Sequence, residues 1–95
     1  MKIEVRFFAN LRELAKTKAV VEDIKSGASV GDVIQKICER FGVKFREQVL
    51  GKLGQSNENV KILLNGHNIV FLQGAATELR DGDVIAIFPP VGGGS

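Results

Sequence analysis

The stretch "SGASVGDVIQKICERFG", residues 26–42, is the clearest local signal in this 95-residue sequence. Ser29 is a candidate N-cap, and Asp32, at the third helical position, can complete a capping box. Gly42 can take the left-handed conformation that ends a helix. The apolar residues between these ends recur at helical spacing, at Val30, Val33, Ile34, Ile37, Cys38 and Phe41. The stretch therefore predicts an amphipathic helix laid on a sheet.

Two strand patterns precede this helix. Residues 2–8, "KIEVRFF", alternate apolar and charged side chains, which is typical of a strand with one buried face. A short helical turn should follow, with Asn10 as its cap and Glu13 reaching back to it. Residues 19–24, "AVVEDI", are rich in β-branched side chains and predict a second strand that pairs with the first.

The second half of the chain predicts a short helix and three strands. Residues 43–50 carry Phe45 and Val49 at helical spacing, and a polar loop then runs to residue 59. The run at 60–64 leads into Asn65-Gly66, a strong hairpin signal, and a short strand should follow. "VIAIF" at 84–88 is apolar at both parities, so we expect a fully buried strand. We place this strand parallel to the first, side by side with it at the centre of the sheet.

Length and composition describe one small globular domain. Apolar residues make up 44% and charged residues 25%, with a formal net charge of +2 and no basic run, so nucleic acid is not indicated. The N-terminus has no uninterrupted apolar stretch, which argues against a membrane span or signal peptide. The single cysteine and the lack of a Cys/His cluster fit a reducing, cytoplasmic setting without a metal site.

Three features could carry chemistry, and each has a simpler structural interpretation. Asp81 and Asp83 flank a glycine, as in a tight turn whose carboxylates hydrogen-bond their own backbone. His67 follows a hairpin turn with no sequence neighbour to act with, which favours a solvated side chain. Cys38 lies on the apolar stripe of the predicted helix, where a buried small side chain is expected. We favour the structural interpretation for all of them.

The C-terminal "FPPVGGGS", residues 88–95, is the strongest candidate for a working part. Pro89 and Pro90 favour extended backbone that projects the chain away from the last strand. The glycines that follow have no Cβ and can enter a narrow channel. Extended residues 90–94 reach on the order of 16 Å, enough to present a carboxylate to another protein's active site. The alternative is a frayed end.

Three segments together resemble the ubiquitin-like sulfur carriers: "FFANLREL" at 7–14, "LRDGDVIAIFPP" at 79–90 and "VGGG" at 91–94. The resemblance is greatest to the small subunit of molybdopterin synthase, the MoaD type, and to the small archaeal modifier proteins. Thiamine-pathway carriers are less similar, since they usually lack the two prolines. The resemblance implies an α+β, ubiquitin-like β-grasp fold, a mixed sheet of four to five strands with one main helix on one face. Residues 1–88 would form this domain and residues 89–95 a flexible tail.

The resemblance implies that the chain is not an enzyme by itself and binds no cofactor. A ubiquitin-activating-type enzyme would use ATP to adenylate Gly94, which forms the terminal pair with Gly93. A persulfide donor would then leave a thiocarboxylate, and the large catalytic subunit of molybdopterin synthase would pass the sulfur to a pterin precursor. Alternatively, the same glycine would be joined to lysines of target proteins. Ser95 departs from the pattern, because it follows the reactive glycine.

A docking surface should lie beside the tail. The candidate partner-binding residues are Phe7, Arg12, Leu14, Phe88, Pro89, Pro90, Val91 and Gly92. Phe88 is the favoured anchor, because an aromatic side chain at a strand end suits an interface hot spot. Phe7 and Leu14 could equally be core residues, since Phe7 shares strand parity with Ile3 and Val5. A third hypothesis is a β-grasp module that binds RNA or protein through its sheet.

Overall fold

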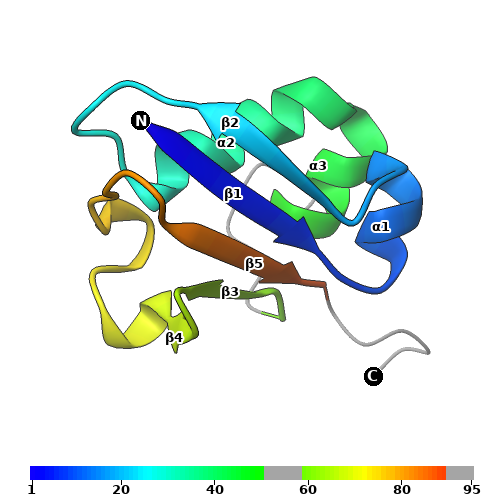
Figure 1. Cartoon of the computed structure of the whole chain (residues 1–95). Helices are drawn as coiled ribbons and strands as arrows, with labels where there is room; N and C mark the ends of the chain where they lie inside the picture. The colour runs from blue at the N-terminus through cyan, green and yellow to red at the C-terminus, as the bar shows by residue number, and fades with distance from the viewer. Residues whose placement is uncertain (51–58, 90–95) are drawn as a thin grey trace.

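The computed structural model describes residues 1–50 and 59–89, which form a mixed sheet with helices packed on one face (Figure 1). The strands are β1 Lys2–Phe7, β2 Ala19–Asp23, β3 Lys61–Leu64, β4 His67–Asn68 and β5 Val84–Phe88. The helices are α1 Asn10–Ala15, α2 Val30–Phe41 and α3 Val43–Leu50, with short 3-10 turns η1 Ile69–Phe71 and η2 Gly74–Ala76. The predicted polar loop at 51–59 falls almost entirely outside the described residues, as do residues 90–95 of the predicted tail.

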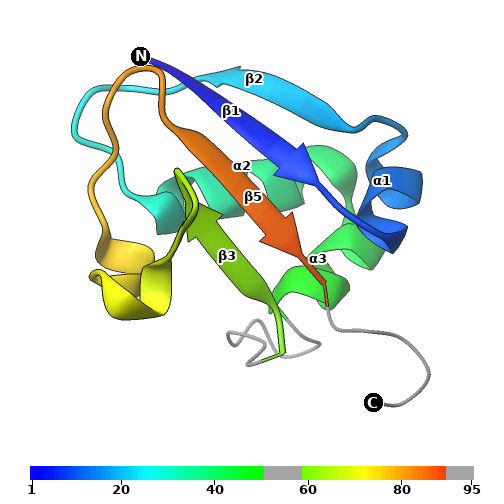
Figure 2. The same ribbon diagram turned by 60° about the horizontal axis from the view of Figure 1, so that its bottom comes forward.

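The sheet has the strand order β2-β1-β5-β3-β4, so the first and last strands lie side by side at its centre, as predicted (Figure 2). These two strands run parallel, with Val5 opposite Ile85 and Phe7 opposite Ile87. All other neighbouring strands pair antiparallel. The C-terminal ends of β1 and β5 therefore meet at one end of the sheet, together with the starts of β2 and β3.

Helix α2 has the predicted cap. The Asp32 N–H donates to Ser29 Oγ at 3.3 Å, and the Ser29 N–H donates to the Asp32 carboxylate at 2.9 Å. The helix ends at Gly42, which has a φ of 92° but an extended ψ in place of the expected left-handed conformation. The reason is that the Gly42 carbonyl already accepts from the Arg46 N–H at 3.0 Å, so α3 begins at once.

The predicted cap of α1 is wrong. Ala9 occupies the cap position with a φ of 53°, and no side chain caps this helix. The backbone of the strand end supplies the bonds instead, because Phe8 O accepts from the Leu11 N–H and Ala9 O from the Arg12 N–H, both at 3.1 Å. Because these acceptors are backbone carbonyls, no residue type in the local sequence indicates them.

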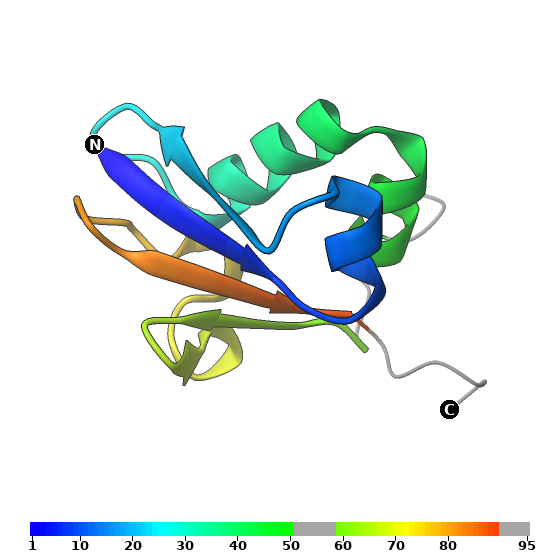
Figure 3. The ribbon, with the colours of Figure 1, turned by 45° about the vertical axis from the view of Figure 1, so that its right-hand side comes forward.

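The helices cover one face of the sheet and leave the other open (Figure 3). Fully buried Phe7 packs edge-on against Phe41 and Phe45, with ring centroids 5.4 Å apart in each case. The expectation of a fully buried β5 is wrong: Ile85 and Ile87 are buried, whereas its three other residues, Val84, Ala86 and Phe88, are part-exposed. Since none of the described helices covers the outer face, its apolar residues remain accessible.

Both aspartates lie in the turn before β5, where Asp83 bonds the backbone of the turn as predicted and Asp81 instead bonds the start of β1. The Asp83 carboxylate accepts from the Arg80 N–H at 2.8 Å and from Asn65 Nδ2 at 2.9 Å. Asp81 accepts from the Lys2 N–H at 2.6 Å. The two carboxylates thus join the turn before β5 to the start of β1 and to the neighbouring hairpin turn.

The cap of α2 gives a first prediction. Ser29→Ala removes the acceptor of the Asp32 N–H and should lower the free energy of unfolding by about 1 kcal/mol. Urea unfolding of both chains measures the difference. Ser26→Ala makes the same change in the exposed loop before the helix and serves as the control. Equal losses in the two variants would contradict a capping role.

The Asp32 carboxylate gives a second prediction. The backbone and side-chain hydrogen bonds with Ser29 hold the pKa of Asp32 below its ordinary value of 3.8. Because the pKa of Asp32 is lower in the folded chain than in the unfolded one, the carboxylate stabilises the fold at pH values above 3.8. This stabilisation is lost as the pH falls through the pKa of the folded state. The stability difference between the wild type and Asp32→Asn should therefore shrink below about pH 4, as urea unfolding at a series of pH values will show. A constant difference down to pH 2 would contradict this account.

Candidate functional site

Two aromatic rings stack on the open face where β1 and β5 end. Phe8 and Phe88 have ring centroids 4.2 Å apart and an interplanar angle of 11°. Their position follows from the parallel register, because Phe7 lies opposite Ile87 and the next pair outward is Phe8 and Phe88. Both rings are part-exposed. A stacked apolar surface therefore stands directly before Pro89, where the tail begins.

Arg12 completes this surface. Its Nε donates to the carbonyl oxygen of Phe7 at 2.8 Å, and its guanidinium carbon lies 5.1 Å from the Phe8 ring centroid. One bond to backbone and one contact with a ring fix the guanidinium while the side chain stays exposed. We call Arg12, Phe8 and Phe88 the aromatic column.

Phe7 is not part of the docking surface, which corrects the sequence-based choice. Its side chain is fully buried among Phe41 and Phe45, because it shares strand parity with the buried residues Ile3 and Val5. Phe8 was missed as a surface residue, although the alternation of the strand indicated its direction. Arg6, two residues earlier, points outward, so Phe8 had to point away from the core while Phe7 points into it.

The other predicted docking residues differ in exposure. Leu14 is half-buried and packs against the core. Pro89 is buried, so its side chain offers no contact surface, which corrects its placement in the docking set. The remaining tail candidates lie outside the described residues: Pro90, Val91, Gly92, Gly93 and Gly94. Of the predicted docking residues, the structure brings Arg12 and Phe88 together.

Cys38 is buried and His67 is exposed, as the structural interpretation predicted. Cys38 is buried in the core, and desolvation raises the pKa of its thiol to about 11, so it is not a thiolate at neutral pH. His67 is exposed in β4, just past the hairpin turn. In the described part of the chain, no three His, Cys, Asp or Glu side chains gather closely enough to hold a metal ion.

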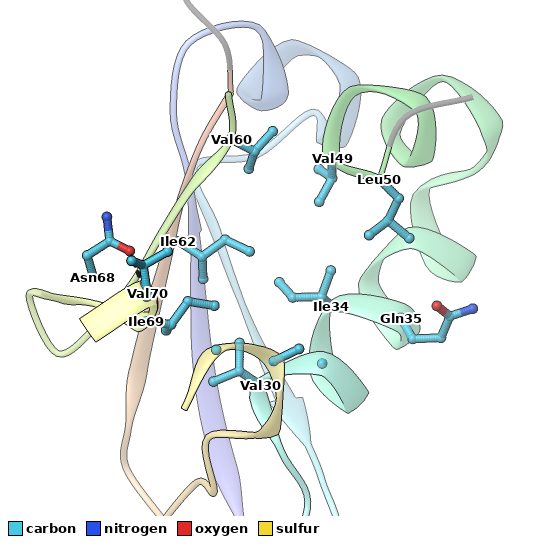
Figure 4. Close-up of a pocket in the computed structure, with 13 residues that line it drawn as sticks. Val30, Ile34, Gln35, Val49, Leu50, Val60, Ile62, Asn68, Ile69 and Val70 are labelled. Carbon is cyan, nitrogen blue, oxygen red and sulfur yellow. Dashed lines mark hydrogen bonds between the residues drawn. The ribbon is translucent and has the colours of Figure 1, made fainter. Parts of the chain in front are cut away.

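A cavity of about 400 Å³ lies between the helices and the β3 side of the sheet (Figure 4). Aliphatic side chains from α2, α3, β3 and η1 form most of its wall, including Ile34, Val49, Ile62 and Ile69. Among the described residues that line it, the polar side chains are those of Gln35 and Asn68, and none is ionisable. Among the described helices, none has the length and hydropathy that a membrane span requires.

The comparison with solved structures defines the class of protein. The chain aligns with the crystal structure of SAMP1 from Haloferax volcanii with a TM-score of 0.86 and 28% identity, covering 98% of this chain and 99% of that one. The fold is therefore the ubiquitin-like β-grasp that the sequence resemblance implied, and the chain is of the small ubiquitin-like carrier class.

Sequence comparison gives the family. The model of the ThiS family matches residues 5–94, so the chain belongs to this family. It is 37% identical to the small archaeal modifier protein 3 of Haloferax volcanii, covering 99% of this chain and all of that protein. It is 28% identical to the molybdopterin synthase sulfur carrier subunit of Drosophila ananassae, over 99% of this chain and 92% of that protein. The resemblance noted from the sequence motifs is thus confirmed.

Adjacent phenylalanines allow a matched test of core and surface. Phe7→Ala should lower the free energy of unfolding by about 3–5 kcal/mol, because it empties a fully buried site. Phe8→Ala removes a part-exposed stacked ring and should cost only about 1–2 kcal/mol. Chemical unfolding of the two variants measures both values. A larger loss for Phe8→Ala would reverse the assignment of the two side chains.

Proposed function

We propose that this chain is a sulfur carrier whose Gly94 is converted to a thiocarboxylate for molybdopterin synthesis. The observation that carries the proposal is the aromatic column, an ordered apolar surface on the open face directly before the tail. The relation to a molybdopterin synthase sulfur carrier subunit over nearly the whole chain supports it. Because ATP-dependent activation and persulfide donors belong to the cytoplasm, we propose that location too.

The chemistry follows from the poor reactivity of a carboxylate. A Gly94 oxygen attacks the α-phosphorus of ATP, pyrophosphate leaves, and the glycine becomes an acyl adenylate on the partner enzyme. A persulfide sulfur then attacks the carbonyl carbon and AMP leaves, after which a thiol cleaves the sulfur–sulfur bond to release the thiocarboxylate. Ser95 follows Gly94 in the sequence and has to be removed before the first step.

This chain supplies position while its partners supply catalysis. The stacked rings and the fixed guanidinium give an adenylating enzyme, or the large subunit of molybdopterin synthase, a rigid surface to bind. An extended stretch of five residues spans on the order of 16 Å, which is the length we propose for carrying Gly94 into the partner's active site. ATP is bound by the activating partner, and we assign no cofactor to this chain.

A second function uses the same activated glycine. The relative of 37% identity is named a modifier protein, which supports conjugation to lysines. In that reaction the amine of a lysine attacks the activated carbonyl carbon in place of the persulfide. Both functions need the same adenylating partner and differ in the final nucleophile, so one chain can serve both.

A pair of truncations tests the role of the tail. A chain without residues 93–95 should lose all sulfur transfer and conjugation in its own cell, because the reactive carboxylate is gone. The matched control lacks Ser95 alone and should keep full activity. Molybdenum-cofactor content and the amount of conjugated protein are the measurements. Normal activity of the longer deletion would contradict the carrier function.

The intact mass of the native protein separates the two functions. Loss of Ser95 with a gain of about 16 Da, as sulfur replaces oxygen, marks the thiocarboxylated carrier. A glycine remnant on lysines of other proteins after digestion marks the modifier. Retention of Ser95 in every form would contradict the chemistry proposed at Gly94.

A further inference from the structure

Three consecutive apolar side chains are exposed on and just after η1. The exposed fractions are 75% for Val70, 84% for Phe71 and 45% for Leu72. A 3-10 helix has three residues per turn, so the side chains of η1 point in three different directions. Ile69 points inward and is buried, which leaves Val70 and Phe71 to point outward. The geometry of the turn therefore places an aromatic ring in solvent.

Hydrogen bonds from side chains hold this segment at both of its ends. At its start, Asn68 Oδ1 accepts from the Val70 N–H at 3.0 Å. At its end, the Thr77 hydroxyl accepts from the Gln73 N–H at 3.1 Å and donates to the Gly74 carbonyl at 2.7 Å. The exposed apolar side chains thus stand on ordered backbone. Less conformational entropy is lost when a partner binds an ordered segment than when it binds a flexible one.

The exposed side chains lie at the edge of the apolar cavity between the helices and the β3 side of the sheet. Figure 4 shows Ile69 and Val70 on one side of this cavity and Ile34 and Gln35 on the other. Phe71 directly follows Val70, which lines the cavity. One face of the molecule therefore carries a projecting ring and, beside it, an apolar hollow of about 400 Å³.

This face is poor in charge. Residues 68–77, "NIVFLQGAAT", contain no charged side chain, although charged residues make up 25% of the sequence. The described residues that line the cavity include no ionisable side chain either. An uncharged surface can meet a copy of itself without like-charge repulsion, whereas it has nothing to pair with the charges of an acidic or basic partner. The charge pattern therefore favours a second copy of this chain as the occupant.

We propose that two copies of this chain associate through this face, with Phe71 of each copy entering the cavity of the other. In a twofold dimer the same patch occurs on both subunits, so the patch has to be complementary to itself. A projecting ring beside an apolar cavity meets that requirement, because a twofold axis next to Val70 brings each ring over the other copy's cavity.

The area of the contact predicts a weak dimer. A buried phenylalanine side chain removes about 150–250 Å² from water. Two copies of Phe71, with Val70, Leu72 and the cavity walls, bury on the order of 1,000 Å², which is the low end for a specific interface. We therefore expect a dissociation constant between about 10 µM and about 1 mM.

The proposed dimer leaves the aromatic column accessible. Ile62 lines the cavity, and its neighbour Lys61 lies opposite Phe88 on the open face. Since successive side chains of a strand point to opposite faces, the cavity and the Phe88 ring lie on opposite faces of the sheet. This inference is thus independent of the proposed function, and either can fail without the other.

Two exposed valines provide a matched test. Val70 and Val43 are 75% and 70% exposed, and Val43, at the start of α3, does not line the cavity. Sedimentation equilibrium of the full chain, from about 10 µM to about 1 mM, measures the dissociation constant. Val70→Ser and Phe71→Ser should each raise it about tenfold or more, because they remove apolar contacts at the centre of the interface. Val43→Ser should stay within about twofold of the wild type.

Gln35→Glu tests the cavity side of the contact. The two side chains have the same shape, and Gln35 is exposed at the edge of the cavity. The change places a carboxylate at the edge of both cavities in the dimer, so it should weaken association more at low salt than at high salt. Thermal unfolding of each variant establishes that the fold is intact.

Several results would overturn the proposed dimer. These are a wild-type chain that stays monomeric at about 1 mM, equal effects of Val70→Ser and Val43→Ser, and a dimer that Phe71→Ser does not weaken. A monomeric chain that enhances the fluorescence of anilinonaphthalene sulfonate would also overturn it, since the cavity would then bind a small apolar molecule instead of a second copy.

Discussion

The parallel pairing of β1 with β5 is the interaction on which the rest of the structure depends. This pairing joins the first and last strands of the domain at the centre of the sheet, with Val5 opposite Ile85 and Phe7 opposite Ile87. The buried residues of this pair form the floor on which α2 and α3 pack. Because the register is fixed, the next residues outward, Phe8 and Phe88, stack on the open face. The core and the aromatic column thus lie on opposite faces of one strand pair.

Because the described helices pack on a single face of the sheet, its two faces differ in what they contribute. The covered face supplies stability, through residues such as Phe45 and Ile37 that are fully buried. The open face keeps the aromatic column accessible beside the base of the tail. A chain of this size has little room for a catalytic cleft, and its described cavity holds no ionisable side chain. Under the proposed function, the open face would bind a partner enzyme while the covered face keeps the domain folded.

Features encoded in short stretches could be predicted from the sequence. The capping box of Ser29 and Asp32 and the apolar stripe of α2 are local, and the central position of β1 and β5 followed from their apolar character. The cap of α1 could not be predicted, because strand-end carbonyls and Ala9 replace a capping side chain. The exposure of the outer residues of β5 could not be predicted, since apolar residues on an open face give the same sequence pattern as buried ones. The register that sets Phe8 beside Phe88 depends on a long-range pairing, which local pattern does not specify.

The composition of the aromatic column has a consequence for fidelity. Its two rings lie near opposite ends of the amino-acid sequence, and they meet only when β5 has paired with β1 in register. An unfolded or truncated chain can carry a flexible terminus, but it cannot assemble this stacked pair. Under the proposed function, an adenylating enzyme that binds both rings would therefore activate a folded chain in preference to an unfolded one.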